Sequence, residues 1–147
     1  MYREFRNTFI FGAPGTGKSK FLRYYIEELI DDRTDDSEII LLSHKPLGYH
    51  SSKIVLQSTN DFDETIKEVY EKYTRRLENP VTKVLPKQYF FLDGLRKTYD
   101  KISEESKKML GEMMSEGPKA NLYCVMTSST KDFDEQILSG STVIELK

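Results

Sequence analysis

Eight consecutive residues near the amino terminus carry the strongest chemical signal in this sequence. They read Gly12-Ala13-Pro14-Gly15-Thr16-Gly17-Lys18-Ser19 and directly follow the apolar residues 8–11. The glycines let the backbone turn tightly and aim its N–H groups inward, and a helix beginning at Lys18 would add its positive dipole end. In such a loop the lysine reaches the β- and γ-phosphates and the serine hydroxyl ligates Mg²⁺. The pattern therefore predicts a binding site for a nucleoside triphosphate with Mg²⁺, with Lys18 on the phosphates and Ser19 on the metal.

A second candidate site residue is Asp93, which follows the apolar run Tyr89-Phe90-Phe91-Leu92. A carboxylate at the end of a buried strand beside the loop can hold Mg²⁺ through its water shell. The alternative is that Asp93 caps a turn with Gly94. Many P-loop hydrolases place a glutamate after this aspartate to orient the attacking water, whereas this chain has Gly94. The usual general base is missing, so the sequence predicts slow hydrolysis.

Two further positions have a possible role at the phosphates. The hydroxyl run Thr127-Ser128-Ser129-Thr130 follows another apolar stretch and could sense a γ-phosphate, or could instead provide helix N-caps. Arg96 lies shortly after Asp93 and could serve a neighbouring subunit as an arginine finger, although an exposed arginine is usually just solvated. Both alternatives remain open at the level of sequence.

Other polar clusters do not match known site chemistry. His44 and His50 have no cysteine or carboxylate at metal-ligand spacing, and both are predicted to lie on the surface. The acidic residues within 31–36 lack the glycine and terminal glutamate of a calcium loop. Arg75 and Arg76 are predicted to interact with the dipole at a helix end. The predicted chemistry therefore centres on the glycine-rich loop.

Length and composition limit the classes of protein that fit. The 147 residues suffice for one domain, and 22 basic against 24 acidic residues leave a net charge of -2. This balance offers no general attraction to nucleic acid, so no nucleic-acid partner is expected. No apolar run approaches the roughly 20 residues that cross a bilayer, and residues 1–7 do not resemble a signal peptide, so a cytoplasmic location is expected. The single cysteine, Cys124, is predicted to be a buried, inert thiol.

Apolar spacing predicts strands that alternate with helices along the chain. Strands are expected at residues 8–11, 38–43, 53–57, 88–93, 122–127 and 142–146. Helices are expected at 18–30, from Asp61 to Asn79-Pro80, from Ser103 to Gly117-Pro118, and at 131–138. Crossover connections between parallel strands place helices on both sides of the sheet. The expected fold is therefore an α/β three-layer sandwich with a mainly parallel sheet.

Local signals also predict helix caps and buried faces. Asp61 and Ser103 are expected as N-caps of their helices. The methionine-rich face of the helix after Ser103 is expected to be core rather than a binding surface. In the first helix one buried face is expected, made of Phe21, Leu22, Tyr25, Ile26, Leu29 and Ile30.

With these elements placed, the sequence resembles the FtsK/SpoIIIE class of additive-strand P-loop ATPases. It is most similar to a carboxy-terminal, degenerate ATPase domain of the EssC/EccC motors of type VII secretion. Three stretches carry the likeness, at residues 9–19, 89–94 and 109–128, and only the first is individually specific. The sequence departs from that family because it is shorter than a full motor domain and lacks the acid after Asp93.

The resemblance implies a RecA/FtsK-like fold with ATP and Mg²⁺ as ligands. Lys18 and Ser19 would contact the triphosphate and the metal, and Asp93 the metal. Residues 1–147 would form one ATPase domain of a longer, membrane-anchored chain that acts in protein export. Its partners would be neighbouring ATPase domains and secreted proteins, and only other parts of the parent chain would reach the membrane. The domain would face the cytoplasm.

The principal expectation is an ATP-binding, motor-type domain with weak or no hydrolysis of its own. A small nucleotide or metabolite kinase is an alternative, but such a kinase usually needs a lid with paired arginines, and none is evident after Asp93. A non-hydrolysing interaction module, with the loop as a structural relic, is a third possibility. Titration with ATP separates the relic from the other two functions, and a screen of phosphoryl acceptors identifies a kinase.

Overall fold

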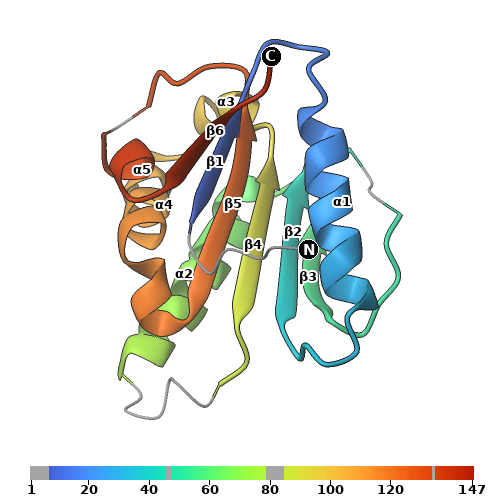
Figure 1. Ribbon diagram of the computed structural model, residues 1–147. Coiled ribbons are helices and arrows are strands. Elements are labelled where there is room, and N and C mark those ends of the chain that lie inside the picture. Colours follow the sequence, from blue (N-terminus) through green and yellow to red (C-terminus); the bar gives the residue numbers. More distant parts are fainter. Residues whose placement is uncertain (1–6, 46–47, 79–84, 134) are drawn as a thin grey trace.

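The computed structural model describes residues 7–45, 48–78, 85–133 and 135–147 (Figure 1). Its strands are β1 (Thr8–Phe11), β2 (Glu38–Ser43), β3 (Ile54–Ser58), β4 (Gln88–Asp93), β5 (Leu122–Ser128) and β6 (Thr142–Glu145). Its helices are α1 (Lys18–Asp31), α2 (Phe62–Glu78), α3 (Leu95–Tyr99), α4 (Glu104–Glu116) and α5 (Glu135–Ser139), and the 3₁₀ turn η2 (Gly117–Ala120) follows α4. None of these helices is long and apolar enough to cross a membrane.

The six strands form one parallel sheet in the order β3-β2-β4-β5-β1-β6. β5 therefore lies between β1, which leads into the glycine-rich loop, and β4, which ends at Asp93. In the register of the sheet, Phe11 is opposite Ser128 and Ser43 is opposite Asp93. The carboxyl ends of these strands thus meet at one edge. The predicted α/β fold with a mainly parallel sheet is confirmed.

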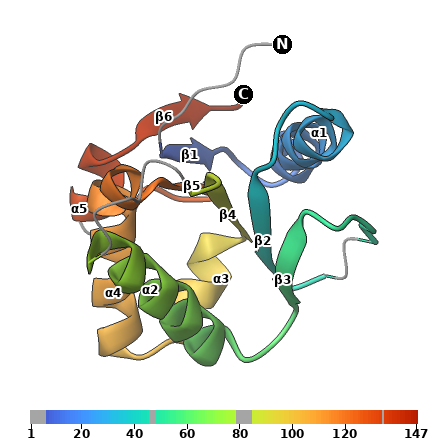
Figure 2. The ribbon, with the colours of Figure 1, turned by 90° about the horizontal axis from the view of Figure 1, so that it is seen from below.

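Helices cover both faces of the sheet (Figure 2), with α1 on one face and α2, α3 and α4 on the other. Strand β4 shows why its sequence is an uninterrupted apolar run. Tyr89 and Phe91 belong to the buried cluster around α1, whereas Phe90 and Leu92 belong to the cluster around α2 and α4. Successive side chains of a strand point to opposite faces, so a strand covered on both faces is apolar throughout. The predicted three-layer arrangement follows from this pattern.

Helix α1 begins at the glycine-rich loop and is held at its other end by a lysine from the sheet edge. Lys53 Nζ donates to the carbonyl oxygens of Leu29 and Asp32 at 2.5 and 2.6 Å. A cation at this position complements the negative end of the helix dipole. Leu22 and Leu29 are buried as predicted, but Phe21 is 38% exposed, so the buried face of α1 is narrower than expected.

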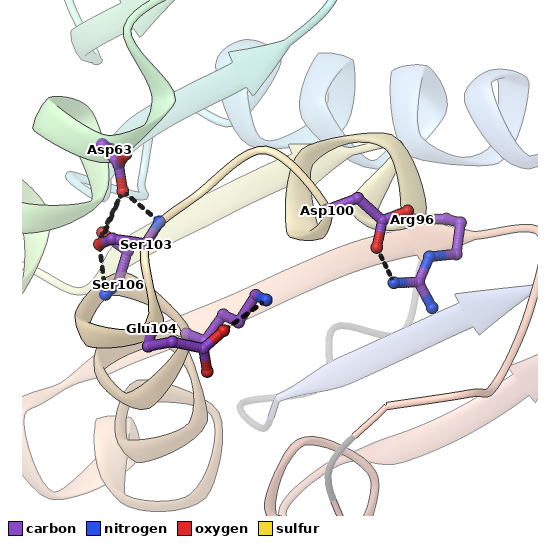
Figure 3. Close-up of polar contacts among 7 residues, drawn as sticks. Asp63, Arg96, Asp100, Ser103, Glu104 and Ser106 are labelled. Carbon is purple, nitrogen blue, oxygen red and sulfur yellow. Dashed lines mark hydrogen bonds and ion pairs between the residues drawn. The ribbon is translucent and has the colours of Figure 1, made fainter.

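Asp63, in the first turn of α2, joins that helix to the start of α4 (Figure 3). Its Oδ1 accepts hydrogen bonds from the Ser103 N–H at 2.9 Å, the Ser103 hydroxyl at 3.1 Å and the Ser106 hydroxyl at 2.6 Å. The bonds from Ser106 and then Ser103 lower the pKa of Asp63. Ser103 Oγ also accepts from the Ser106 N–H at 3.1 Å, which confirms the predicted N-cap.

Other predicted helix boundaries have mixed outcomes. Asp61 directly precedes α2, and its carbonyl accepts from the Thr65 N–H at 3.0 Å, so it occupies the predicted N-cap position. The predicted helix end at Asn79-Pro80 lies outside the described residues. The predicted helix start at residue 131 is wrong, because residues 131–133 are not helical and α5 begins at Glu135. Helix α3 is absent from the prediction because five residues are too few to establish a helical period.

Arg76 is buried rather than exposed at a helix end. It is 8% exposed, its Nη1 donates to the Pro86 carbonyl at 2.7 Å, and its Nη2 lies 3.4 Å from Glu38 Oε1. These partners replace the water that burial removes from the guanidinium. Arg76 therefore anchors α2 to the amino-terminal edge of the sheet, which corrects the dipole role predicted from sequence. Arg75 is exposed and pairs with Glu71 at 2.7 Å.

Cys124 lies in the centre of the core, as predicted. It is fully buried in β5, and burial raises the pKa of its thiol well above the usual range. Its backbone N–H donates to Asn7 Oδ1 at 2.7 Å. The thiol is therefore protonated and shielded from reagents in the folded chain.

Candidate nucleotide-binding site

The glycine-rich loop joins β1 to α1 at the carboxyl edge of the sheet. Gly15 and Gly17 have φ of 86° and 89°, in the left-handed region that other residues rarely adopt. Gly12 is constrained differently, because a Cβ there would lie 2.5 Å from Thr16 Oγ1 and 2.6 Å from the Leu146 carbonyl oxygen. The segment after β6 thus runs directly against the loop. Gly15 and Gly17 are thus favoured by their backbone conformation, and Gly12 by the lack of space for a side chain.

Lys18 is the first residue of α1, and its side chain folds back over the loop. Its Nζ donates to the carbonyl oxygens of Gly12 at 2.6 Å and Ala13 at 3.1 Å. Thr16 Oγ1 donates to the same Ala13 carbonyl at 2.7 Å, and Pro14 is exposed at the tip. The ammonium group therefore lies beside the amino end of α1, where unpaired N–H groups and the helix dipole favour an anion.

Asp93 is held by two hydroxyls from different elements. Ser19 Oγ donates to Oδ2 at 3.0 Å, and Thr127 Oγ1 donates to Oδ1 at 2.5 Å. Ser19 is 74 positions away in sequence, yet the topology brings it to the end of β4 because α1 begins at the same edge of the sheet. The two predicted metal ligands therefore lie within hydrogen-bonding distance of each other.

Gly94 follows Asp93 in a conformation that suits glycine. Its φ is 88°, and its N–H donates to Thr127 Oγ1 at 2.9 Å. A side chain in this left-handed conformation strains the backbone. The backbone at position 94 therefore favours glycine over the glutamate that many P-loop hydrolases have there.

A cavity of about 260 Å³ opens beside the Ser19–Asp93 pair. Its lining includes four cationic side chains and one carboxylate, which belong to Lys18, Lys45, Arg96, Lys97 and Asp93. This excess of positive charge favours an anionic ligand. A second cavity, of about 300 Å³, also borders Ser19 and Asp93 and is otherwise lined by α1 and Tyr49. The first cavity contains Lys18 and is the better candidate for phosphates.

The donor set at the end of β4 suits a hard cation. Mg²⁺ prefers oxygen ligands and is usually held by one or two carboxylates, waters and substrate phosphates rather than by a complete protein cage. Ser19 and Asp93 offer a hydroxyl and a carboxylate. Within the part of the chain that the structure describes, no group of three His, Cys, Asp or Glu side chains could hold a metal. The residues present fit a Mg²⁺ ion that is bound together with phosphates.

His44 lies at this site and not on the open surface, which corrects the prediction. It follows β2 and lines the same cavity as Lys18. Its ring packs edge-on against Phe62, with ring centroids 4.5 Å apart, and Nε2 is 3.0 Å from Thr98 Oγ1. Burial, then the charges of two nearby lysines, lower the pKa of His44, so the ring is neutral near pH 7. His50 is exposed, as predicted.

Arg96 is held within the chain. It donates to the Asp132 carbonyl at 2.9 Å, pairs with Asp100 (Figure 3), and its guanidinium lies 4.7 Å from the centre of the Phe133 ring. Its side chain is 27% exposed. Arg96 is therefore not simply solvated, and a role as an arginine finger would require it to break these contacts.

The hydroxyls at the end of β5 and just after it have different contacts. Thr127 contacts Asp93, and Ser128 Oγ accepts from the Thr130 N–H at 3.1 Å. Residues 129–133 contain no helix, so the alternative of helix N-caps is wrong. Ser128 and Ser129 line the cavity that contains Lys18, and a role in sensing a γ-phosphate stays a prediction.

Comparison with solved structures finds this fold in ATPase domains. ATPases 2 and 3 of EssC from Geobacillus thermodenitrificans match with a TM-score of 0.73 at 14% identity, over 97% of this chain and 32% of that chain. The cytoplasmic domain of the Thermomonospora curvata type VII secretion ATPase EccC matches with a TM-score of 0.75 at 14% identity, over 95% and 19%. ATPases 2 and 3 of the same EccC, in complex with a signal sequence peptide, match with a TM-score of 0.69 at 14% identity, over 88% and 26%. The fold is that of these ATPase domains.

The likeness is one of structure and covers one part of much larger proteins. This chain spans about a third or less of the length of the three solved chains. A scan against protein-family models gives no match, and a search of curated proteins gives none either. The activity of the larger proteins is therefore a proposal for this chain.

Proposed function

We propose that this chain is a MgATP-binding domain of motor type, from a larger protein-export ATPase of the EssC/EccC kind. The observation that carries the proposal is the hydrogen bond from Ser19 to Asp93 at 3.0 Å, which joins the glycine-rich loop to the end of β4. A hydroxyl and a carboxylate at this distance beside a phosphate loop are what a bound MgATP requires.

Each residue of the loop has a task in this proposal. Backbone N–H groups of residues 15–19 and the positive end of α1 surround the β-phosphate, and Lys18 turns from the carbonyls of Gly12 and Ala13 to the β- and γ-phosphates. Ser19 and Asp93 would hold the metal, with a hydroxyl and a carboxylate oxygen. Mg²⁺ supplies positive charge to the phosphate oxygens when it is bound.

The wider setting rests on the solved structures. Residues 1–147 would be one domain in a row of ATPase domains, since the structural neighbours contain several. Its partners would be those neighbouring domains and a secreted protein, because one neighbour is in complex with a signal sequence peptide. The domain would work on the cytoplasmic side and would reach the membrane only through other parts of its parent chain. A nucleic-acid partner is not part of the proposal, because the net charge is -2.

The kinase alternative is less favoured. After Asp93 the chain enters α3, whose Leu95, Thr98 and Tyr99 are buried, and then α4, which packs on the sheet. Within residues 85–133, which the structure describes, the segment after β4 is thus part of the core instead of a lid. A screen of nucleotide and metabolite acceptors that finds phosphoryl transfer would restore the kinase.

The test is a titration of the purified chain with MgATP. Lys18→Ala is expected to weaken binding at least about tenfold, or roughly 1.4 kcal/mol, because one charge-assisted contact to phosphate is lost. Lys119→Ala is the charge-matched control, since Lys119 belongs to η2 before the amino end of β5 and is far from the loop. Equal affinity of the parent and Lys18→Ala would remove the basis of the proposal. The third possibility, a non-hydrolysing interaction module, would then be favoured.

A further inference from the structure

The space beside Gly94 is occupied by a side chain from the neighbouring strand. A Cβ built on Gly94 would lie 3.5 Å from His44 Cδ2, the nearest atom outside the adjoining residues. The register explains this contact, because Ser43 on β2 is opposite Asp93 on β4, and His44 is therefore opposite Gly94. The imidazole thus stands next to the position from which a glutamate side chain would extend.

The His44 ring is fixed in place. Phe62, at the start of α2, makes an edge-type contact with the ring, and Nε2 is tied to the hydroxyl of Thr98, which is 1% exposed. None of the hydrogen bonds among the described residues involves Nδ1. A neutral imidazole whose Nε2–H donates to Thr98 has Nδ1 as a free acceptor. Nε2 thus anchors the side chain to Thr98, and Nδ1 is left unengaged on a residue that lines the cavity.

We infer that His44 is the water-positioning residue of this site, in place of the absent glutamate. The inference rests on the proposed MgATP site, because the cavity that His44 lines also contains Lys18, Ser19 and Asp93. His44 Nδ1 accepts a hydrogen bond from the attacking water and orients it. The water oxygen forms a bond to the γ-phosphorus, and the bond from that phosphorus to the β,γ-bridging oxygen breaks, with its electron pair going to ADP. The proton of the water passes to a phosphate oxygen, so His44 ends the step in its original protonation state.

The first test separates binding from turnover. Single-turnover phosphate release, with the protein in excess over MgATP and above the dissociation constant, and the MgATP dissociation constant itself are measured for the parent, His44→Ala and His50→Ala. His44→Ala is expected to lower release at least about tenfold, with the dissociation constant changed less than about twofold, because orientation acts on the rate and not on ground-state binding. The exposed His50 provides a matched histidine control that leaves both quantities unchanged.

Conservative variants distinguish positioning from packing. In His44→Asn the amide lies near the place of Nδ1, and in His44→Gln it lies near the place of Nε2. Asn is therefore expected to retain more release than Ala, and more than Gln, although both amides fill the space. Equal release by Asn, Gln and Ala would overturn the inference, and so would parent-like release by His44→Ala. If His44→Ala does not fold, the comparison of His44→Asn with His44→Gln still tests the inference.

A second readout needs no nucleotide. ¹⁵N NMR of the histidine rings of the parent, assigned with the His50→Ala variant, is expected to show His44 in the Nε2–H tautomer, and an Nδ1–H tautomer would overturn the inference. Parent release no faster than that of Lys18→Ala would also overturn it, while intact MgATP binding in the same samples would leave the proposed function standing. If the parent itself does not bind MgATP, the proposed function is wrong, and the inference about His44 is wrong with it.

Discussion

The hydroxyl of Thr127 donates to Asp93 Oδ1 at 2.5 Å and accepts from the Gly94 N–H at 2.9 Å. One side chain on β5 therefore positions two consecutive residues at the end of β4. Thr127 is fully buried, so water would not take over these two hydrogen bonds if the hydroxyl were removed. This contact leaves Asp93 Oδ2 for Ser19 on the opposite side.

Thr127→Val keeps the shape of the side chain but removes both hydrogen bonds. The Mg²⁺-dependent part of the ATP affinity is expected to fall about tenfold, because losing a hydrogen bond to a charged carboxylate costs about 1.5 kcal/mol. Titrations with ATP in the presence and absence of Mg²⁺ measure this difference. Thr127→Ser is the control, since it retains the hydroxyl and should bind like the parent. Equal Mg²⁺ dependence in the Val variant would show that Asp93 does not need this support.

The isolated chain is expected to hydrolyse ATP slowly. The glycine-rich loop, Lys18 and Ser19 provide the charge cradle, but no carboxylate follows Asp93 to act as a general base. Such groups contribute about 10² to 10⁴ in rate, so turnover should fall well below the roughly 1 to 10³ per second usual for enzymes. Steady-state phosphate release at saturating MgATP checks this, with Lys18→Ala as background. Release faster than about one per second, and lost in the control, would contradict the prediction.

Adding the absent carboxylate should not restore fast hydrolysis. Gly94 has φ of 88°, so Gly94→Glu would strain the backbone and is expected to lower the free energy of unfolding by about 1 kcal/mol or more. Denaturant unfolding measures the loss, and Gly94→Ala should show a similar one because the strain arises at Cβ. Its side chain would also meet the ring of His44. A tenfold rise in phosphate release by Gly94→Glu would show that the site accommodates a glutamate.

The sequence predicted features that depend on near neighbours. The parallel strands follow from apolar runs, and the glycine-rich loop is a contiguous motif whose backbone needs are local. The sequence-based prediction missed contacts between residues that are distant in the sequence. His44 meets Thr98, Arg76 meets Glu38 and Lys53 caps α1 through contacts 54, 38 and 21 positions apart, and no local period encodes such pairs. Reasoning from strand register would have found His44, because the end of β2 lies beside the end of β4.

Asp63 is expected to make the stability of the chain depend on acid pH. Its pKa is lowered in the folded state, so its contribution is present above the unfolded value, near 3.8, and is lost as the pH falls through the folded pKa. Asp63→Asn should reduce the free energy of unfolding at pH 7 by about 1 kcal/mol, a small loss because the carboxyl group is partly exposed. The difference from the parent should shrink below about pH 4.

Denaturant unfolding of the parent and Asp63→Asn from pH 7 to pH 3 measures this dependence. Asp36→Asn is the comparison, because Asp36 is an exposed carboxylate away from α2 and α4. A constant difference between the parent and Asp63→Asn at all pH values would mean that the carboxylate charge does not matter to the contacts with Ser103 and Ser106.

The buried position of Cys124 has a practical consequence for fluorescence work. The only thiol of the chain is enclosed in the core and remains protonated, so maleimide dyes should not label the native protein. A cysteine introduced at the exposed Ser129, which lines the cavity with Lys18, would then be the single reactive group. A fluorophore attached there would report the arrival and departure of ligand in real time, without the removal of any native residue from the core.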